Sequence, residues 1–157
     1  MFPNSICYKV CLWWFPVCLF LDKVAFHASL YYDKSIQGTT SGQTIVFDQV
    51  VTNLGGGYNG TTGVFTAPVA GTYVFSLTFF MVYQTTKSSR GEVRIMQING
   101  HGLRVFRELD TNIDEGTATG TTVLSLNKGD QVHVITYTTN MFIVGNGLSY
   151  FSGFMLG

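Results

Sequence analysis

Residues 55–75 constrain the fold of this chain more than any other stretch. They read Gly-Gly-Gly-Tyr-Asn-Gly-Thr-Thr-Gly-Val-Phe-Thr-Ala-Pro-Val-Ala-Gly-Thr-Tyr-Val-Phe, so glycine-rich turns alternate with short apolar runs. Glycine adopts turn geometries that are closed to other residues, and proline followed by glycine marks a boundary between strands. From Tyr73 to Phe79, large apolar side chains occupy every second position. This alternation predicts a β-strand with one face in a hydrophobic core.

The same pattern continues over the chain after residue 23. Apolar runs are separated by turn residues roughly every 8–12 positions, the spacing typical of a β-sandwich, and no window shows a sustained helical period. The predicted strands are residues 24–30, 44–51, 63–66, 72–83, 92–98, 103–108, 121–126, 131–138 and 150–156. Such strands must bury one face of each of two sheets. We therefore predict an all-β sandwich without an interior helix. Immunoglobulin domains carry a Cys…Trp…Cys arrangement, which is missing here because both tryptophans precede residue 24. A jelly roll is therefore favoured over an immunoglobulin-like sandwich.

The composition favours association between copies of the chain. Charged residues make up 11% of the sequence, against about 25% in a typical soluble domain. Hydrophobic residues reach 46%, with 13 Phe and 8 Tyr. Large exposed apolar patches are rare on monomers, so an oligomer that buries such a patch is favoured over an unusually apolar monomer. The formal net charge is zero, which weakens attraction to nucleic acids and predicts no such partner.

Residues 1–23 form an apolar leader, and the predicted domain spans residues 24–157. The apolar run 10–21 is shorter than the roughly 20 residues that cross a bilayer, but it resembles the hydrophobic region of a secretory signal. We therefore expect a secreted protein without a stable membrane span. A short anchor and a misassigned first exon are the alternatives. All three cysteines lie in the leader, without the spacing of a zinc site.

The sequence gives little support for an enzyme. His27, His101 and His133 are far apart, and neither a His-Glu-x-x-His nor a Gly-x-Ser-x-Gly motif occurs. We therefore predict a non-enzymatic protein with no catalytic residue and no cofactor, calcium apart.

Basic residues gather in and just before the predicted hairpin of residues 92–108. Arginine binds carboxylates and phosphates through paired hydrogen bonds, so this cluster could capture sialic acids, sulfated glycans or lipopolysaccharide. The alternative is a solvated hairpin whose arginines are balanced by acidic neighbours such as Glu92. The candidate ligand-binding residues are Arg90, Arg94, Arg104 and Arg107.

Two further polar segments are candidate sites. Asp110 and Asp114 lie in the acidic stretch 108–116, which offers oxygen ligands suited to calcium, although a solvated acidic loop is the alternative. Asn59-Gly60-Thr61 matches the sequon for N-linked glycosylation, which applies if the chain is exported.

Several segments, taken in order, resemble the complement C1q-type globular domain. They are Val24-Ala25-Phe26, Gly63-Val64-Phe65-Thr66-Ala67-Pro68, Gly71-Thr72-Tyr73-Val74-Phe75, Gly129-Asp130 and Phe151-Ser152-Gly153-Phe154. The resemblance covers residues 24–157. It implies a ten-stranded jelly roll like that of the tumour-necrosis-factor superfamily, assembled as a compact trimer. It also implies calcium binding by aspartates in the loop that corresponds to residues 108–116. The chain has no Gly-X-Y repeat, which forms a collagen stalk in many members.

Aromatic residues are ordinarily buried, and those in the pattern are predicted to form the core. They are Phe26, Phe47, Phe65, Tyr73, Phe75, Phe151 and Phe154.

The resemblance implies a binding module. Our first hypothesis is a lectin-like recognition protein of innate immunity, whose homotrimeric head binds glycans or microbial surface ligands. The alternative is a cytokine- or hormone-like ligand that clusters a receptor. The sequence does not identify the ligand, nor does it distinguish a homotrimer from a heterotrimer.

Overall fold

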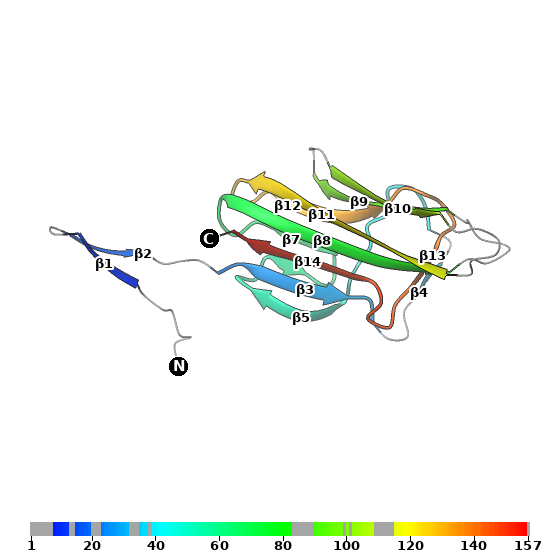
Figure 1. The fold of residues 1–157 in the computed structure, drawn as a ribbon, viewed down its shortest axis with the longest axis horizontal. Coiled ribbons are helices and arrows are strands. Elements are labelled where there is room, and N and C mark those ends of the chain that lie inside the picture. Colours follow the sequence, from blue (N-terminus) through cyan, green and yellow to red (C-terminus); the bar gives the residue numbers. More distant parts are fainter. Residues whose placement is uncertain are drawn as a thin grey trace.

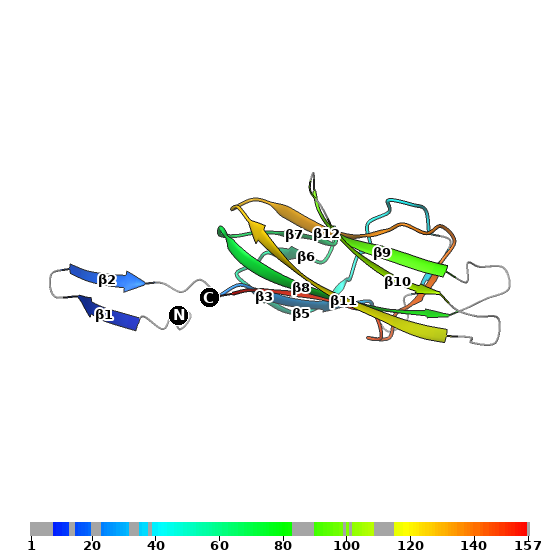
Figure 2. The same ribbon diagram turned by 45° about the horizontal axis from the view of Figure 1, so that its top comes forward.

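The structure, a computed structural model, describes residues 8–12, 15–19, 23–31, 35–37, 39–82, 90–98, 100, 102–108 and 115–156. For residues 8–12, 15–19, 90 and 106–108 it describes the backbone alone. Within these ranges the regular structure is entirely β, and two sheets lie face to face as a sandwich (Figures 1 and 2). The prediction of an all-β jelly roll without an interior helix is confirmed for the part of the chain that the structure describes.

The larger layer is a seven-stranded sheet among the described residues. Its strand order is β4-β13-β8-β14-β3-β5, and β11 pairs with β8. Every pairing in it is antiparallel. Its strands are β3 (Ala25–Ser29), β4 (Ser35–Gln37), β5 (Gln49–Leu54), β8 (Gly71–Val82), β11 (Glu115–Leu126), β13 (Phe142–Val144) and β14 (Tyr150–Met155).

The smaller layer is a five-stranded sheet with the order β10-β9-β12-β7-β6, counted over the described ranges. The chain changes layer repeatedly, because β9 and β10 leave the larger sheet after β8, β11 returns to it, and β12 leaves it again. The strands of the smaller layer are β6 (Tyr58–Asn59), β7 (Val64–Thr66), β9 (Arg90–Gln97), β10 (Gly102–Glu108) and β12 (Gln131–Thr136).

Stacked aromatic rings fill the space between the two layers. The Phe26 ring lies 4.7 Å from the Tyr58 ring, 5.0 Å from Phe151 and 5.2 Å from Phe65, measured between centroids. Strand β8 contributes Tyr73 and Phe75 to the same cluster, and the predicted alternation along this strand is confirmed by the burial of its odd-numbered residues from Tyr73 to Met81. Residues from both sheets therefore share one core.

The structure buries Phe26, Phe47, Phe65, Tyr73, Phe75 and Phe151, but Phe154 is 48% exposed. The prediction that Phe154 belongs to the core is wrong because this side chain points out of the sandwich. Phe151 and Gly153 occupy the inward positions of β14. A Cβ at Gly153 would lie 2.6 Å from Phe26 Cε1 and 2.7 Å from Phe75 Cδ1, so the rings use the space beside this glycine. The next residue, Phe154, faces outward.

Some strand boundaries differ from those predicted. The predicted strand 44–51 is mostly irregular, since Thr44 forms an isolated bridge with Ile135 and β5 begins at Gln49. Ile45 and Phe47 are nevertheless buried, which explains the alternating pattern. Strand β11 begins at Glu115, whereas the predicted strand began at Thr121. The prediction missed the first half of β11 because that half is rich in Thr and Gly and shows little apolar alternation. The two- and three-residue strands β4, β6 and β13 are too short to give a periodic pattern.

The leader contains β1 (Tyr8–Leu12) and β2 (Phe15–Leu19), which form a separate antiparallel two-stranded sheet. Its backbone register pairs Tyr8 with Leu19. Across the described ranges, no helix combines the length and apolar character that a membrane span requires. The interpretation of residues 1–23 as an export signal stays a prediction.

Candidate functional site

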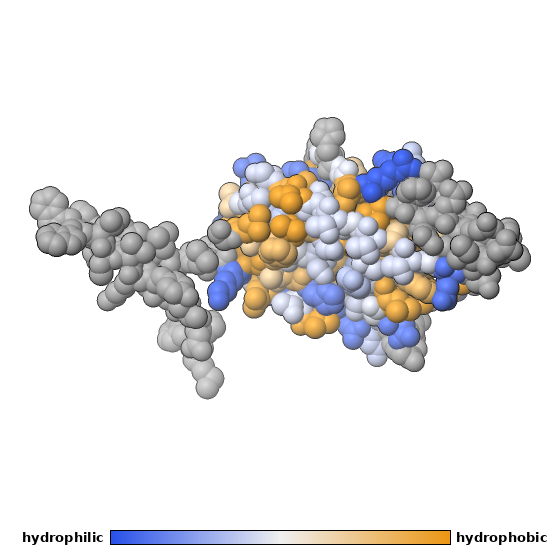
Figure 3. Space-filling view, in the orientation of Figure 1, coloured by the Kyte–Doolittle hydropathy of each residue, from blue (hydrophilic) through white to orange (hydrophobic). Residues whose placement is uncertain are grey.

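The outer face of the seven-stranded sheet is neutral and partly apolar. One row crosses four neighbouring strands and consists of Ala25, Phe154, Val74 and Val123. Phe154 and Val123 are 48% and 58% exposed. Figure 3 shows the resulting hydrophobic area at the end of the sheet where the C-terminus lies. An exposed apolar area of this kind marks a surface suited to a protein contact.

Two hydroxyl-rich rows continue this face. His27 and Ser152 are joined by a hydrogen bond of 2.7 Å between Nδ1 and Oγ, and Thr121 Oγ1 donates to Ser76 Oγ at 3.2 Å. In the next row, the hydroxyls of Thr78 and Thr119 lie 2.9 Å apart. These three rows contain no Lys, Arg, Asp or Glu. The face can therefore meet another neutral surface without burying an ionised carboxylate or ammonium group.

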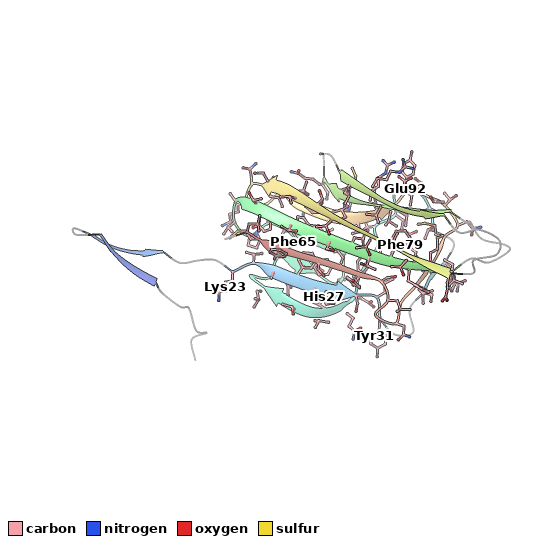
Figure 4. All side chains as sticks on the ribbon, viewed as in Figure 1. Lys23, His27, Tyr31, Phe65, Phe79 and Glu92 are labelled. Carbon is pink, nitrogen blue, oxygen red and sulfur yellow. The ribbon has the colours of Figure 1, made fainter. Side chains whose placement is uncertain are left out.

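A charged cluster occupies the outer face of the other sheet. The β9–β10 hairpin is confirmed, and its register places Arg94 directly across from Arg104. Both guanidinium groups bind Glu92: Arg94 Nε donates to Oε1 at 3.0 Å, and Arg104 Nη2 donates to Oε2 at 2.8 Å. Glu92 is only 2% exposed. Figure 4 shows this residue beside the hairpin, on the opposite side of the molecule from Tyr31.

Tyr137 completes this cluster from the end of β12. The Cζ atom of Arg94 lies 3.6 Å from the centroid of the Tyr137 ring, a cation–π contact. The backbone holds the tyrosine in place, because Tyr137 N donates to the Glu92 carbonyl oxygen at 2.8 Å. Thr138 N donates to the same oxygen at 3.3 Å. An open recess of about 330 Å³ is lined by Glu92, Arg104, Tyr137, Thr138 and Thr139.

This arrangement suits an anionic ligand. Both guanidinium groups pair with Glu92, so the cluster places two cationic side chains on one buried carboxylate. Because the carboxylate and the Tyr137 ring hold Arg94, less side-chain freedom remains to be lost when a ligand binds. The exposed tyrosine ring and the two threonines offer an apolar surface and hydroxyl groups beside that charge.

The structure brings together two of the four predicted arginines, Arg94 and Arg104. Arg90 and Arg107 lie at the far end of the same hairpin, opposite Glu108 and Gly91 in the register, and their side chains are outside the described part. Asp110 and Asp114 also lie outside the described residues.

Sequence reasoning missed Tyr137, Thr138 and Thr139. Strand pairing between β12 and β9 places Ile135 next to Arg94, which brings the residues just after β12 to the arginines. No local motif marks that contact. In the alternative of a solvated hairpin, Glu92 balances the arginines at the surface; the structure buries this residue and pairs it with Arg94 and Arg104.

Among the described side chains, no three His, Cys, Asp or Glu residues are placed to share a metal ion. His133 Nδ1 lies 3.2 Å from Thr44 Oγ1 instead, and burial lowers the pKa of His133 below its ordinary value. His101 is outside the described ranges.

His133 should make the fold less stable in mild acid. Because its pKa is lower in the folded chain than in the unfolded chain, the unfolded chain takes up the proton first as the pH falls. The free energy of unfolding is therefore unaffected by His133 at pH values above the ordinary histidine pKa, about 6.5, and it falls as the pH drops below that value. Thermal unfolding at about pH 7.5 and about pH 5.5 should show a smaller acid-induced fall for His133→Gln than for the wild type. Equal falls would contradict this assignment.

Comparison with known proteins identifies the family of this chain and agrees with its fold. The sequence model of the C1q domain family matches residues 25–156. Heavy metal-binding protein HIP of Mytilus edulis is 29% identical over 136 residues, covering 85% of this chain and 60% of that protein. Complement C1q tumor necrosis factor-related protein 2 of Mus musculus is 31% identical over 121 residues, covering 71% of this chain and 37% of that protein. The chain thus spans less than two thirds of the length of both relatives.

Solved structures share the fold. The globular domain of zebrafish complement 1qA protein aligns with a TM-score of 0.68 at 20% identity, covering 86% of this chain and 98% of that one. Murine APRIL aligns with a TM-score of 0.67 at 12% identity, covering 85% and 99%. Since the family model matches nearly all of the sequence that follows the leader, this chain belongs to the C1q domain family.

Proposed function

We propose that this chain is a secreted, non-enzymatic recognition protein whose copies form a homotrimer and bind anionic glycans on microbial or host surfaces. The neutral outer face of the seven-stranded sheet provides the contact between copies. The cluster of Glu92, Arg94, Arg104 and Tyr137 provides the glycan site. Membership of the C1q domain family supports a recognition or signalling role.

The observation that carries the glycan proposal is the buried Glu92 carboxylate with two guanidinium groups bound to it. Burying a carboxylate is costly unless it is paired and hydrogen-bonded. Here the pairing fixes Arg94 and Arg104 next to an exposed aromatic ring. A sugar that bears a carboxylate or sulfate can bind the arginine charge and place its apolar ring face on Tyr137.

Self-association strengthens such a site without new contacts. One charged contact to a sugar is weak, but copies of the site in one assembly act together on a multivalent surface. The proposed glycan site and the neutral face lie on the outer sides of different sheets. Assembly through the neutral face would therefore leave the cluster in solvent.

Arg104→Ala should weaken binding to immobilised sialylated or sulfated oligosaccharides by about 10-fold or more, because a charged hydrogen bond contributes about 1.5–3 kcal/mol. Arg104→Lys keeps the charge but loses the planar geometry, so we expect intermediate binding. Lys128→Ala is the matched control, since Lys128 is exposed on the turn at the other end of β12. Biolayer interferometry on charged and neutral oligosaccharides measures the difference. Equal binding by Arg104→Ala and the wild type would rule out this site.

The same measurement with and without calcium tests the second predicted site. Calcium binding by Asp110 and Asp114 stays a prediction, and the name of the mussel relative gives a reason to examine metals. Dependence of glycan binding on added calcium would support that prediction.

A signalling ligand is the alternative function. The similarity to complement C1q tumor necrosis factor-related protein 2 favours it. Specific, saturable binding to a cell-surface protein that persists in Arg104→Ala and after removal of cell-surface glycans would support this alternative.

A further inference from the structure

The sequon Asn59-Gly60-Thr61 forms an exposed turn after β6. Asn59 Oδ1 accepts hydrogen bonds from Thr61 N at 2.9 Å and Thr62 N at 3.2 Å, the arrangement of an Asx-turn. Among the described residues, no hydrogen bond engages the Asn59 Nδ2 amide or the Thr61 hydroxyl. The side chains of Asn59 and Thr61 are both exposed. The two groups that the sequon contributes are therefore accessible in the folded chain.

This turn contacts the edge of the other sheet. A Cβ at Gly60 would lie 2.7 Å from Val50 Cγ2, so the glycine brings the turn close against β5. Gly63 N donates to the Asn59 carbonyl oxygen at 2.8 Å and closes the turn. Anything attached to Asn59 is thus held beside β5.

Strand β5 is an exposed edge with apolar side chains. It pairs with β3 along one side, and the structure describes no strand paired to its other side. Its sequence, Gln-Val-Val-Thr-Asn-Leu, carries no charge, and Val51 is 65% exposed. Unpaired, uncharged and apolar edges invite pairing with strands of other molecules, and proteins usually protect them with charges, bulges or a cover.

We propose that Asn59 carries an N-linked glycan and that this glycan covers the exposed edge of β5. The modification rests on the export that the proposed function includes. The donor is a lipid-linked pyrophosphate oligosaccharide. The Asn59 Nδ2 atom bonds to C1 of the first sugar while the bond from C1 to the pyrophosphate oxygen breaks. The lipid pyrophosphate leaves with that electron pair, and one amide proton passes to a base of the transferase.

The attachment point lies away from the anion site and from β11, the strand at the far end of the neutral face from β5. In the five-stranded sheet, β6 is at the opposite edge from β10, which carries Arg104. Four strand spacings of about 4.8 Å separate β6 from β10 and three separate it from β9, so Asn59 lies roughly 14–19 Å across the sheet from the two arginines. In the other sheet, β5 and β11 lie on opposite sides of β8. A glycan beside β5 therefore leaves β11 and the anion site uncovered.

The modification is tested on the full chain, preceded by a heterologous signal sequence and secreted from a eukaryotic cell line. We expect the secreted protein to shift to lower mass after N-glycosidase treatment, with the resulting aspartate located by peptide mass spectrometry at residue 59. Asn59→Gln and Thr61→Ala should abolish the shift, and Thr62→Ala should retain it. An unmodified Asn59 in the secreted wild type would overturn the proposal. A parallel sample with the chain's own leader tests export separately, so failure of export is distinguishable from absence of the glycan.

The covering role is tested by light scattering at increasing protein concentration. We expect Thr61→Ala, and wild type deglycosylated after folding, to form large aggregates at several-fold lower concentration than the glycosylated protein. Adding Val51→Lys to Thr61→Ala should restore the higher limit, because a lysine on the edge opposes strand pairing. Identical limits for glycosylated and deglycosylated protein, or no rescue by the lysine, would overturn the covering role.

Discussion

Phe26→Ala is expected to lower the free energy of unfolding by about 3–5 kcal/mol, the usual cost of removing a buried phenylalanine ring. Phe26 is almost completely buried and lies between the two sheets. Its ring stacks on Tyr58 at 4.7 Å and contacts Phe151 at 5.0 Å. Alanine would remove contacts to both layers and leave a cavity that neighbouring rings can fill only in part.

Denaturant unfolding at one fixed protein concentration measures this loss. Tyr31→Ala is the matched control, because it also removes an aromatic ring, but one that is half-exposed. We expect the control to change stability by less than about 1 kcal/mol. If the two substitutions cost the same, the ring cluster does not hold the sandwich together.

Phe154→Asp is expected to dissociate the assembly into single chains. Phe154 lies in the row with Ala25, Val74 and Val123, and the three rows of this face contain no cationic Lys or Arg that could pair with a new carboxylate. An unpaired charge at a covered interface costs several kcal/mol. A loss of about 4 kcal/mol weakens association about 1,000-fold.

Sedimentation velocity over a range of concentrations tests this expectation, with circular dichroism to show that the β-fold is kept. Leu148→Asp is the control, because Leu148 is exposed in the loop before β14 and lies outside the three rows. We expect the control to sediment like the wild type. A Phe154→Asp variant that sediments like the wild type would show that copies meet elsewhere.

The sequence predicts those parts of the fold that depend on local periodicity. Along β8, every second residue from Tyr73 is large and apolar, and the structure buries each of them. The hairpin of β9 and β10 follows from its Asn-Gly turn and flanking apolar runs. These features need no knowledge of the neighbouring strands.

Features that depend on packing were predicted less well. Phe154 has the composition of a core residue, but its inward neighbour Gly153 makes room for Phe26 and Phe75. A shift of one residue along a strand moves a side chain to the other face of the sheet, and composition alone does not determine which face Phe154 takes. Similarly, residues 45–47 alternate like a strand, but they lie in no regular strand. The adjacent residue Thr44 forms an isolated β-bridge with Ile135.

The candidate site shows the same division. Arg94 and Arg104 could be placed together because the hairpin sets their register. Tyr137 comes from a strand far along the chain, and only the pairing of β12 with β9 brings it to Arg94. Glu92 has the sequence context of a surface residue, but the structure buries it and pairs it with both arginines.

Native mass spectrometry of the secreted protein, with and without a sialylated or sulfated oligosaccharide, tests the central claim most directly. The claim is that one sheet joins the copies while the other binds the anionic sugar. We predict an assembly of three chains that retains the oligosaccharide, and an assembly of three chains without it for Arg104→Ala. A single chain at every concentration, or equal retention of the sugar by both proteins, would contradict this account.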